Sequence, residues 1–440
     1  MMKSVFKMPL LAIALAGFYS QASLAVTLPL SDVIATAQQH DLWQQSANLK
    51  AKALAARSTA ANTQPDPTVS LGLMNLPTDG FAFNQEAMTQ LKIGVNQMFA
   101  RGDSLQHAQQ QLLAEAGQVN WQQAERSAQV ALQVTELWLD AVRAKRAMAL
   151  VVENKALFAE MLAITKASYA SALGKTRQQD VIRAELELLQ LDERIAQEQQ
   201  KLETATARLA SWLQANTPGA EPVAISIPSD FPKLSLTHGN AFNAQPQLVA
   251  LLQQHPALHA LQQGQKRAEQ GIKLAEAQYQ PQWGVNASYA YRDDAPTGMS
   301  RSDFLSVGVS FDVPLFTQNR QDQWRDAALA EAEMSKTQIQ LQLKAMLGQV
   351  YAEYANLKRL YERQQRFNSQ LLTQSQDQAE ATLTAYTHDD GEFSEVVRAR
   401  SNVLQLQLAE LNIHADALKS VAKLNYFLDP NVGQFTGAKP

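Results

Sequence analysis

The feature that most constrains this chain is the placement of its prolines. Two tracts, 78–217 and 315–429, contain none, although the 440 residues include 16 prolines. Because a proline inside a helix costs about 3 kcal/mol, proline-free tracts are where very long helices can form. A helix of about 70 residues would be roughly 100 Å long. A compact globular domain has no use for that length, so the sequence predicts an elongated, mainly helical molecule.

A glycine in a polar setting divides each of these tracts. Gly174 stands in Leu-Gly-Lys-Thr-Arg, and Gly391 stands in Asp-Asp-Gly-Glu. Glycine often ends a helix, so each position is predicted to be the turn of a helical hairpin. The predicted helix pairs are 104–172 with 176–214 and 319–388 with 394–427. Apolar residues spaced alternately by four and three predict coiled-coil packing in the second hairpin; they are Leu343, Leu347, Val350, Tyr354, Leu357 and Tyr361.

Four short segments alternate apolar residues with small or polar ones. They are predicted as strands at 68–75, 90–99, 283–292 and 304–313. Alternation with a period of two places the apolar residues on one face of a sheet and the others on the opposite face. The polar face is predicted to carry Ser70, Lys92, Asn96, Asn286, Ser288, Ser306, Ser310 and Asp312.

The chain also repeats its own plan. Leu91-Lys-Ile-Gly-Val-Asn is similar to Leu305-Ser-Val-Gly-Val-Ser, and Asp180-Val-Ile-Arg-Ala is similar to Glu395-Val-Val-Arg-Ala. Each half therefore reads as helix, two strands and a long helical hairpin. The expected organisation is a repeat at 26–216, a proline-rich connector at 217–246, a second repeat at 247–429 and a tail at 430–440.

The N-terminus and the composition narrow the functional class. Lys3 and Lys7 precede an apolar run, so residues 1–25 are predicted to be a secretory signal peptide. The absence of cysteine excludes disulfides and a lipid anchor on cysteine. The formal net charge of −4 provides no basic surface for nucleic acid. An exported chain of this composition is not expected to bind nucleic acid.

We expect no enzyme activity, no cofactor and no metal site. The sequence contains no phosphate-binding loop, nucleophile elbow or zinc-protease motif. His255 and His259 are four residues apart on a predicted helix, a spacing that can hold a metal. A third suitable ligand is not found near them in the sequence. Both histidines are therefore predicted to lie on a solvated helix face.

Four strands are too few to close a membrane barrel. Strands in lipid must close on themselves because unpaired edges cannot be left there, and single-chain barrels begin at eight strands. The predicted strands are about as long as an outer membrane requires. The sequence thus favours an oligomer sharing one barrel, with the apolar face toward lipid and the polar face toward a watery lumen. The alternative is a soluble periplasmic coiled-coil adaptor or scaffold, which would not need an uninterrupted apolar exterior.

Several segments resemble the TolC-type outer-membrane efflux proteins. The resemblance rests on Gly308-Val-Ser-Phe-Asp-Val-Pro-Leu-Phe with Asn319-Arg320, on Tyr169, Gly174 and Asp180-Val-Ile-Arg-Ala, and on the duplicated plan. It implies a mainly α fold with a small β part. Three chains would form a homotrimer with one 12-stranded β-barrel, continuous with a long coiled-coil α-helical barrel that extends from the outer membrane into the periplasm of a Gram-negative cell.

The resemblance also implies partners and a function. The family forms the exit duct of tripartite pumps, together with a periplasmic adaptor (a membrane fusion protein) and an inner-membrane transporter of the RND type. Asn75-Leu-Pro-Thr-Asp, residues 90–99 and Arg101-Gly-Asp-Ser are similar to the heavy-metal branch, which is CusC- or CzcC-like. A duct for type I secretion of peptides or proteins is the alternative with the same fold.

Two groups of site residues follow from the resemblance. A gate at the periplasmic tip would use Asp180 and Glu395 as a ring of carboxylates, with Asp389 and Asp390 nearby and Arg177 and Arg398 as ion-pair partners. The alternative is that these acids cap helix N-termini or are solvated. The adaptor would dock at the two turns, on Gly174, Lys175, Thr176, Gly391 and Phe393.

Overall fold

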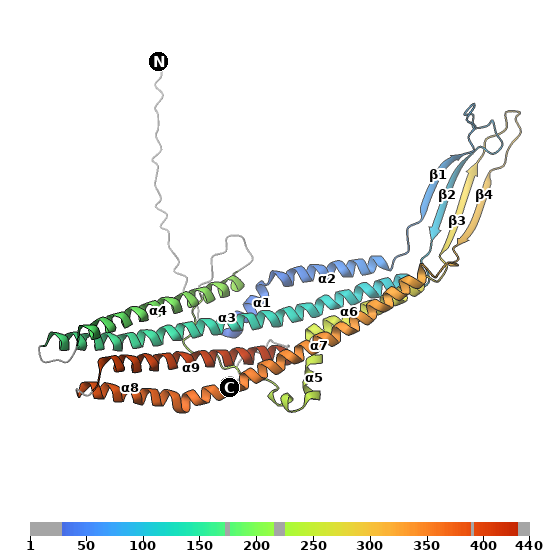
Figure 1. Ribbon diagram of the computed structural model, residues 1–440. Helices are drawn as coiled ribbons and strands as arrows, with labels where there is room; N and C mark the ends of the chain where they lie inside the picture. The colour runs from blue at the N-terminus through green and yellow to red at the C-terminus, as the bar shows by residue number, and fades with distance from the viewer. Residues whose placement is uncertain (1–28, 172–176, 215–224, 389–390, 430–440) are drawn as a thin grey trace, which may run out of the picture.

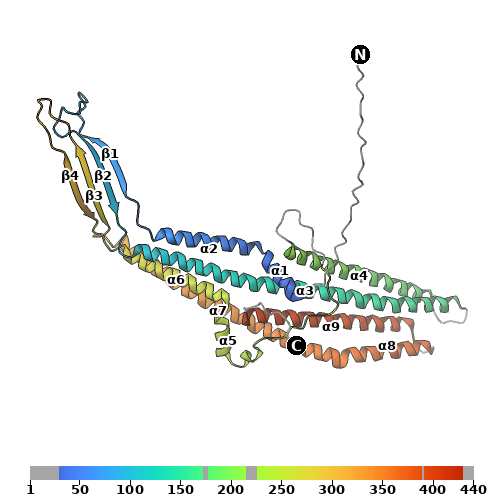
Figure 2. The same ribbon diagram turned by 180° about the vertical axis from the view of Figure 1, so that it is seen from behind.

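The computed structural model describes residues 29–171, 177–214, 225–388 and 391–429. They form a long, narrow body with a four-stranded sheet at one end and helices running away from it (Figures 1 and 2). The ends of both helical hairpins lie opposite the sheet, at the far end of the body. The elongated, mainly helical molecule predicted from the proline-free tracts is therefore confirmed. Within the described ranges, no helix is both long and apolar enough to cross a membrane.

The first half of the chain has the predicted order of elements. Its elements are α1 (Leu30–His40), α2 (Leu42–Ala61), β1 (Thr68–Met74), β2 (Gln90–Met98), α3 (Ser104–Ala170) and α4 (Gln178–Leu213). Helix α3 spans 67 residues because its sequence contains no proline. The break between α1 and α2 falls at Asp41, whose carboxylate accepts a hydrogen bond from the backbone N of Trp43 at 3.1 Å and so caps α2.

The second half repeats this order. Its elements are a 3₁₀ turn (Gly239–Asn243), α5 (Gln245–Gln253), α6 (Pro256–Ala277), β3 (Trp283–Tyr291), β4 (Phe304–Phe311), α7 (Gln321–Arg366), α8 (Leu372–Thr387) and α9 (Phe393–Leu428). One regular helix was predicted over 319–388, and this is wrong in detail. A π-helical turn, Phe367–Leu371, separates α7 from α8. Such a turn has wider hydrogen bonding and carries no proline or glycine signal in the sequence.

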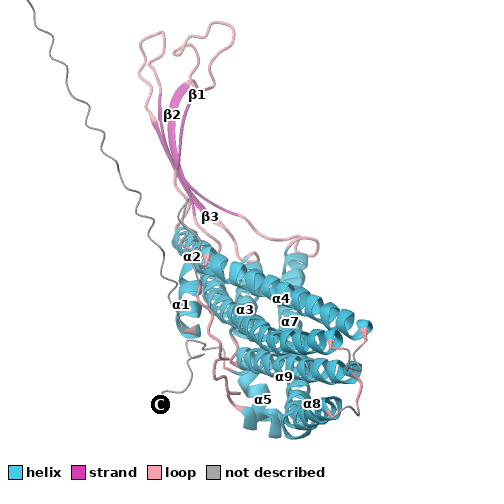
Figure 3. Cartoon of the chain, turned by 90° about the vertical axis from the view of Figure 1, so that its left-hand side faces the viewer, coloured by secondary structure: helices cyan, strands magenta, loops and turns pink. Residues whose placement is uncertain are grey.

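The helices form a wall whose members change along its length. Near the sheet, α3 packs against α2 and α6, and α6 packs against α7. Farther from the sheet, α3 packs against α4 and α9, and α9 packs against α8. Figure 3, viewed from the end away from the sheet, shows α4, α3, α9 and α8 stacked in that order. Helices α2 and α4 lie at one edge of the wall, and α7 and α8 lie at the other.

The three largest apolar clusters of the described residues hold the wall together. One surrounds Trp138 where α3 meets α1 and α4. Another surrounds Met346 and Leu424 where α7 meets α9. The third lies toward the far end and includes Phe158 of α3 and Leu191 of α4. Fully burying a large apolar side chain contributes about 1.5–3 kcal/mol, so these contacts are the main stabilising ones.

The predicted coiled-coil seam is only partly correct. Val350 and Leu357 are buried as expected, but Tyr361 is 49% exposed and its neighbour Leu360 is buried instead. Met346 is also buried on this face of α7. A leucine has no polar atom to desolvate, whereas a buried tyrosine hydroxyl needs a hydrogen-bond partner. Leu360 is therefore buried in the core, and Tyr361 lies at the surface.

The sheet joins the two halves of the chain. Its order is β1-β2-β3-β4, and every neighbouring pair is antiparallel. The central pair, β2 and β3, brings together strands that are separated in sequence by α3, α4, α5 and α6. Both repeats therefore contribute to one sheet rather than each forming its own.

Candidate functional site

The sheet has one polar and one apolar face, as the alternation predicts. Residues directly opposite each other in an antiparallel pair lie on the same face. Ser70, Gly94, Ser288 and Ser306 are opposite one another in turn and form one row across all four strands. The remaining predicted residues on the strands follow the same parity; they are Lys92, Asn96, Asn286 and Ser310. These residues share one face of the sheet, and the role of that face as the wall of a lumen remains a prediction.

The opposite face is apolar and uncovered in the single chain. Leu71, Leu305 and Val307 are each more than 70% exposed, and the other strands contribute further large apolar residues. Strands β1 and β4 lie at the two edges of the sheet. The outer edge of each strand has no partner strand in the described chain. A continuous apolar face of this kind marks a surface that contacts lipid or protein. Unpaired edge strands are available to pair with further strands.

Asp312 has a different setting from the other predicted polar residues. It lies one residue beyond β4, and its carboxylate forms an ion pair with Arg101. The Asp312 Oδ1 atom also accepts hydrogen bonds from Arg101 Nη1 at 3.1 Å and from the backbone N of Gln282 at 2.6 Å. Asp312 therefore fastens the loop before α3 to the start of β3, at the base of the sheet.

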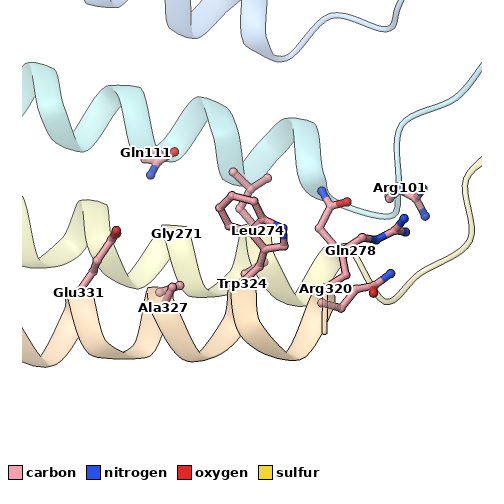
Figure 4. A pocket seen from close by; sticks show the side chains of 12 residues that line it. Arg101, Gln111, Gly271, Leu274, Gln278, Arg320, Trp324, Ala327 and Glu331 are labelled. Atoms are coloured by element: carbon pink, nitrogen blue, oxygen red, sulfur yellow. The ribbon is translucent and has the colours of Figure 1, made fainter. Parts of the chain in front are cut away.

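A pocket of about 660 Å³ lies at this junction between sheet and helices. We call it the neck pocket; residues of α3, α6 and α7 and of the loops leading into α3 and α7 form it (Figure 4). Trp324 of α7 lies beside Leu274 of α6, and Arg320 lies at the end of the pocket where the loops leave the helices. Sequence reasoning missed this pocket. The spacing of Arg320, Trp324, Ala327 and Glu331 on one face of a helix was the available signal.

The predicted tip residues divide into capping and groove positions. The Oδ2 atom of Asp180 accepts a hydrogen bond from the backbone N of Arg177 at 2.9 Å, as a helix-capping carboxylate does. Glu395 and Arg398 line a groove of about 750 Å³ together with Arg183 and Glu187 of α4. The groove thus lies between the two helical hairpins, near their far ends.

The two predicted turns are only partly described. Gly174, Lys175, Thr176, Asp389 and Asp390 lie outside the described residues. Gly391 lies in the predicted second turn, where a Cβ atom would approach the backbone N of Tyr386 to 3.0 Å. A larger residue would therefore crowd the end of α8.

Phe393 was expected to contact an adaptor, and the structure places it elsewhere. Its side chain is only 4% exposed. The ring packs in the cluster that includes Phe158 and Leu191, and its centroid lies 5.6 Å from that of Tyr386. An aromatic ring at the start of α9 is stabilised more by this burial than by exposure to water. We therefore withdraw Phe393 from the docking residues.

The prediction for His255 is wrong, because this histidine is fully buried. Its Nδ1 atom accepts a hydrogen bond from the backbone N of Ala257 at 3.2 Å, and Nε2 lies 3.2 Å from the backbone O of Tyr426. The ring of His259 stacks on Trp121 at 4.3 Å rather than pointing freely into water. Among the described residues, no group of three or more His, Cys, Asp or Glu side chains is arranged to hold a metal.

Comparison with known families identifies this architecture. Residues 248–428 match the family model described as outer membrane efflux protein. The second half of the chain is therefore similar to this family. Solved outer-membrane proteins share the fold of the chain as a whole. A search of curated proteins gives no match to the sequence.

Solved structures share the fold over almost the whole length. The chain is similar to the outer membrane protein VceC of Vibrio cholerae, with a TM-score of 0.74 and 17% identity over 91% of this chain and 95% of that one. It is similar to the open state of the Neisseria gonorrhoeae MtrE outer membrane channel, with a TM-score of 0.69 and 15% identity over 91% and 88%. CusC matches with a TM-score of 0.72 and 14% identity over 94% and 95%.

Proposed function

We propose that three copies of this chain join their sheets into one 12-stranded barrel and conduct solute passively from the periplasm to the exterior. An inner-membrane transporter of the RND type would deliver the solute through a periplasmic adaptor. The domain division predicted from the sequence is kept in this proposal. The second repeat, 247–429, spans the part of the chain that the family model matches.

The observation that carries the proposal is the sheet. Its apolar face is continuous and exposed on all four strands, and both of its edges lack partners within the described chain. Pairing β4 of one copy with β1 of the next would satisfy the edges and close a barrel with its apolar face toward lipid. The rival, a soluble adaptor or scaffold, gives no reason for such a face. The polar face would then line water-filled space.

The solved structures with this fold do not favour one particular cargo. The heavy-metal branch stays a prediction, because CusC is matched no more closely than VceC. Peptide secretion by a type I system is also compatible with a passive duct. We therefore propose efflux of small solutes, with the substrate selected by the inner-membrane transporter.

A reconstitution experiment tests the channel. The full chain, purified in detergent, is expected to form a trimer by light scattering and to give stepwise ion conductance in a planar bilayer. A monodisperse monomer that needs no detergent would contradict the proposal and favour the soluble adaptor. Trimers that insert into the bilayer without conducting ions would support the barrel but contradict the function as a duct.

A further inference from the structure

We infer that the neck pocket binds an organic solute with an apolar or aromatic body and an anionic group at one end. This inference rests on the proposed function, because the solute would meet the pocket during transit. It adds a recognition site at the junction of sheet and helices to a duct that otherwise only conducts. The evidence is an unpaired cation, an exposed indole, a small-residue floor and a buried amide without a partner.

The cation is Arg320. Arg101 also lines the neck pocket, but its guanidinium is already paired with Asp312. The Arg320 side chain has no hydrogen-bond or ion-pair partner within the described part of the chain. A guanidinium binds carboxylates, sulfonates and phosphates through two parallel N–H donors. Arg320 is thus free to hold the anionic group of a ligand at the end of the pocket nearest the strands.

The apolar part of the pocket follows along α7. Trp324 stands one turn after Arg320 and is 66% exposed, which is unusual for so large an apolar ring. Its indole lies beside Leu274 (Figure 4). Because Gly271 has no side chain, the neighbouring surface of α6 leaves space for a ligand. A flat ring could stack on the indole without displacing a side chain. Glu331 marks the other end, eleven residues or roughly 16 Å from Arg320.

A second, independent observation points to a ligand. Gln321 lines the same pocket, is only 2% exposed, and its Oε1 atom has no hydrogen-bond partner in the described structure. An unsatisfied buried polar atom is costly, and proteins seldom keep one without a reason. The unpartnered atom is an acceptor, so it would take a hydrogen bond from a hydroxyl or amine of the ligand rather than contact the anionic group. A ligand donor beside the indole is therefore the partner that Oε1 lacks.

Charge argues against metal cations at this place. The free group at the strand end is a guanidinium, which repels a cation and attracts an anion. The single carboxylate at the other end, Glu331, cannot coordinate a metal alone. The neck pocket therefore favours anionic organic solutes over the heavy-metal cations suggested by the sequence.

Calorimetric titration of the trimer tests this inference. The full chain is placed in nanodiscs of zwitterionic lipid, so that the lipid supplies no net anion, and is titrated with naphthalene-2-sulfonate. We expect saturable binding that is at least about tenfold weaker in Arg320→Gln, because a charge-assisted hydrogen bond is lost. Trp324→Ala should also weaken binding. The matched control is Lys336→Gln, which removes one positive charge from α7 outside the pocket, where Lys336 pairs with Glu333; it should bind like the wild type.

The possible results are distinguishable. Absence of saturable binding, or equal binding by Arg320→Gln and Lys336→Gln, would overturn the inference. The neutral analogue naphthalene-2-carboxamide should bind weakly and without dependence on Arg320; equal affinity for both ligands would also overturn it. If Arg320→Gln does not assemble, Trp324→Ala decides the question. Conductance without binding rejects only the pocket, whereas trimers that do not conduct reject the proposed function.

Discussion

Asp41 and His255 occupy equivalent positions in the two halves of the chain. Each stands between two helices and caps the second one, accepting a hydrogen bond from the backbone N two residues later. Each also faces α3, and the two α3 residues that they meet are neighbours in sequence. Asp41 Oδ2 lies 2.7 Å from Arg126 Nε, and His255 Nδ1 lies 3.3 Å from Glu125 Oε2. Two adjacent residues of α3, Glu125 and Arg126, therefore contact the residues at the two helix breaks.

The two junctions differ in how well their polar atoms are satisfied. Arg126 donates to both oxygens of Asp41. Because His255 Nδ1 already accepts from Ala257, it offers no proton to Glu125, and Glu125 Oε2 has no hydrogen-bond partner among the described residues. The other oxygen of Glu125 accepts from Gln129 and from the hydroxyl of Tyr426. The His255 junction is therefore the one that should respond to pH.

We predict that acid weakens the His255 junction. Burial lowers the pKa of His255 from its usual 6.5, and His259 adds to this, while Glu125 and the Tyr426 carbonyl act in the opposite direction. A lowered folded-state pKa means that the unfolded chain binds the proton better, so stability is lost as the pH falls below about 6.5. One such group changes the unfolding free energy by at most about 1.4 kcal/mol per pH unit.

The measurement is the apparent melting temperature of the trimer at pH 7.5 and pH 5.5. The decrease on acidification should be smaller in His255→Gln than in the wild type. The same substitution at exposed His388 should keep the wild-type decrease. If His255→Gln also keeps it, then another group titrates and this explanation is wrong.

A second prediction concerns the cap at Asp41. Asp41→Asn keeps an oxygen for the backbone N of Trp43 but loses the charge that faces Arg126, whereas Asp41→Ala loses both. A capping side chain contributes about 1 kcal/mol, so the alanine variant should be less stable locally than the asparagine variant by about that amount. Hydrogen exchange at the first turn of α2 should then be about fivefold faster in Asp41→Ala than in Asp41→Asn. Equal rates would show that the ion pair alone holds the junction.

How far the sequence predicts this structure depends on whether a feature is local. Alternation and proline placement are local patterns, and they predict β3, β4 and the 67 residues of α3 with ends correct to within a few residues. The burial of His255 depends on Glu125 and Tyr426, which lie more than a hundred residues away in sequence. No periodicity within one helix can report such contacts.

The same reason explains the misplaced site residues. Phe393 was assigned to adaptor docking because it lies beside the second predicted turn, but it packs in one apolar cluster with Phe158 and Leu191 of the other hairpin. The neck pocket combines residues of α3, α6 and α7 that become neighbours only when the two halves pack together. A local signal existed only on α7, where Arg320, Trp324, Ala327 and Glu331 share one face of the helix.

A third prediction tests which face of the sheet meets lipid. Val307 lies on the apolar face, and its neighbour Ser306 lies on the polar face. A lysine on the lipid side near the middle of a strand costs about 2–4 kcal/mol, whereas a lysine in a watery lumen costs little. Val307→Lys should therefore reduce the yield of folded trimer in the outer-membrane fraction severely, and Ser306→Lys should leave it nearly unchanged. The reverse ranking would invert the assignment of the faces.

The last prediction separates gating from capping at the tip. Asp180→Asn keeps an oxygen that can accept from the backbone N of Arg177, so α4 should retain its cap while losing the charge. Combined with Glu395→Gln, it removes two carboxylates from each chain near the end of the proposed duct that lies opposite the sheet. Negative charge near a pore mouth attracts cations, so the double variant should show a lower preference for cations, measured as reversal potential under a salt gradient. Asp192→Asn is the control, because Asp192 lies farther along α4 and pairs with Lys155 of α3; it should leave the reversal potential unchanged. A double variant that forms trimers and keeps the wild-type reversal potential would assign Asp180 to helix capping alone.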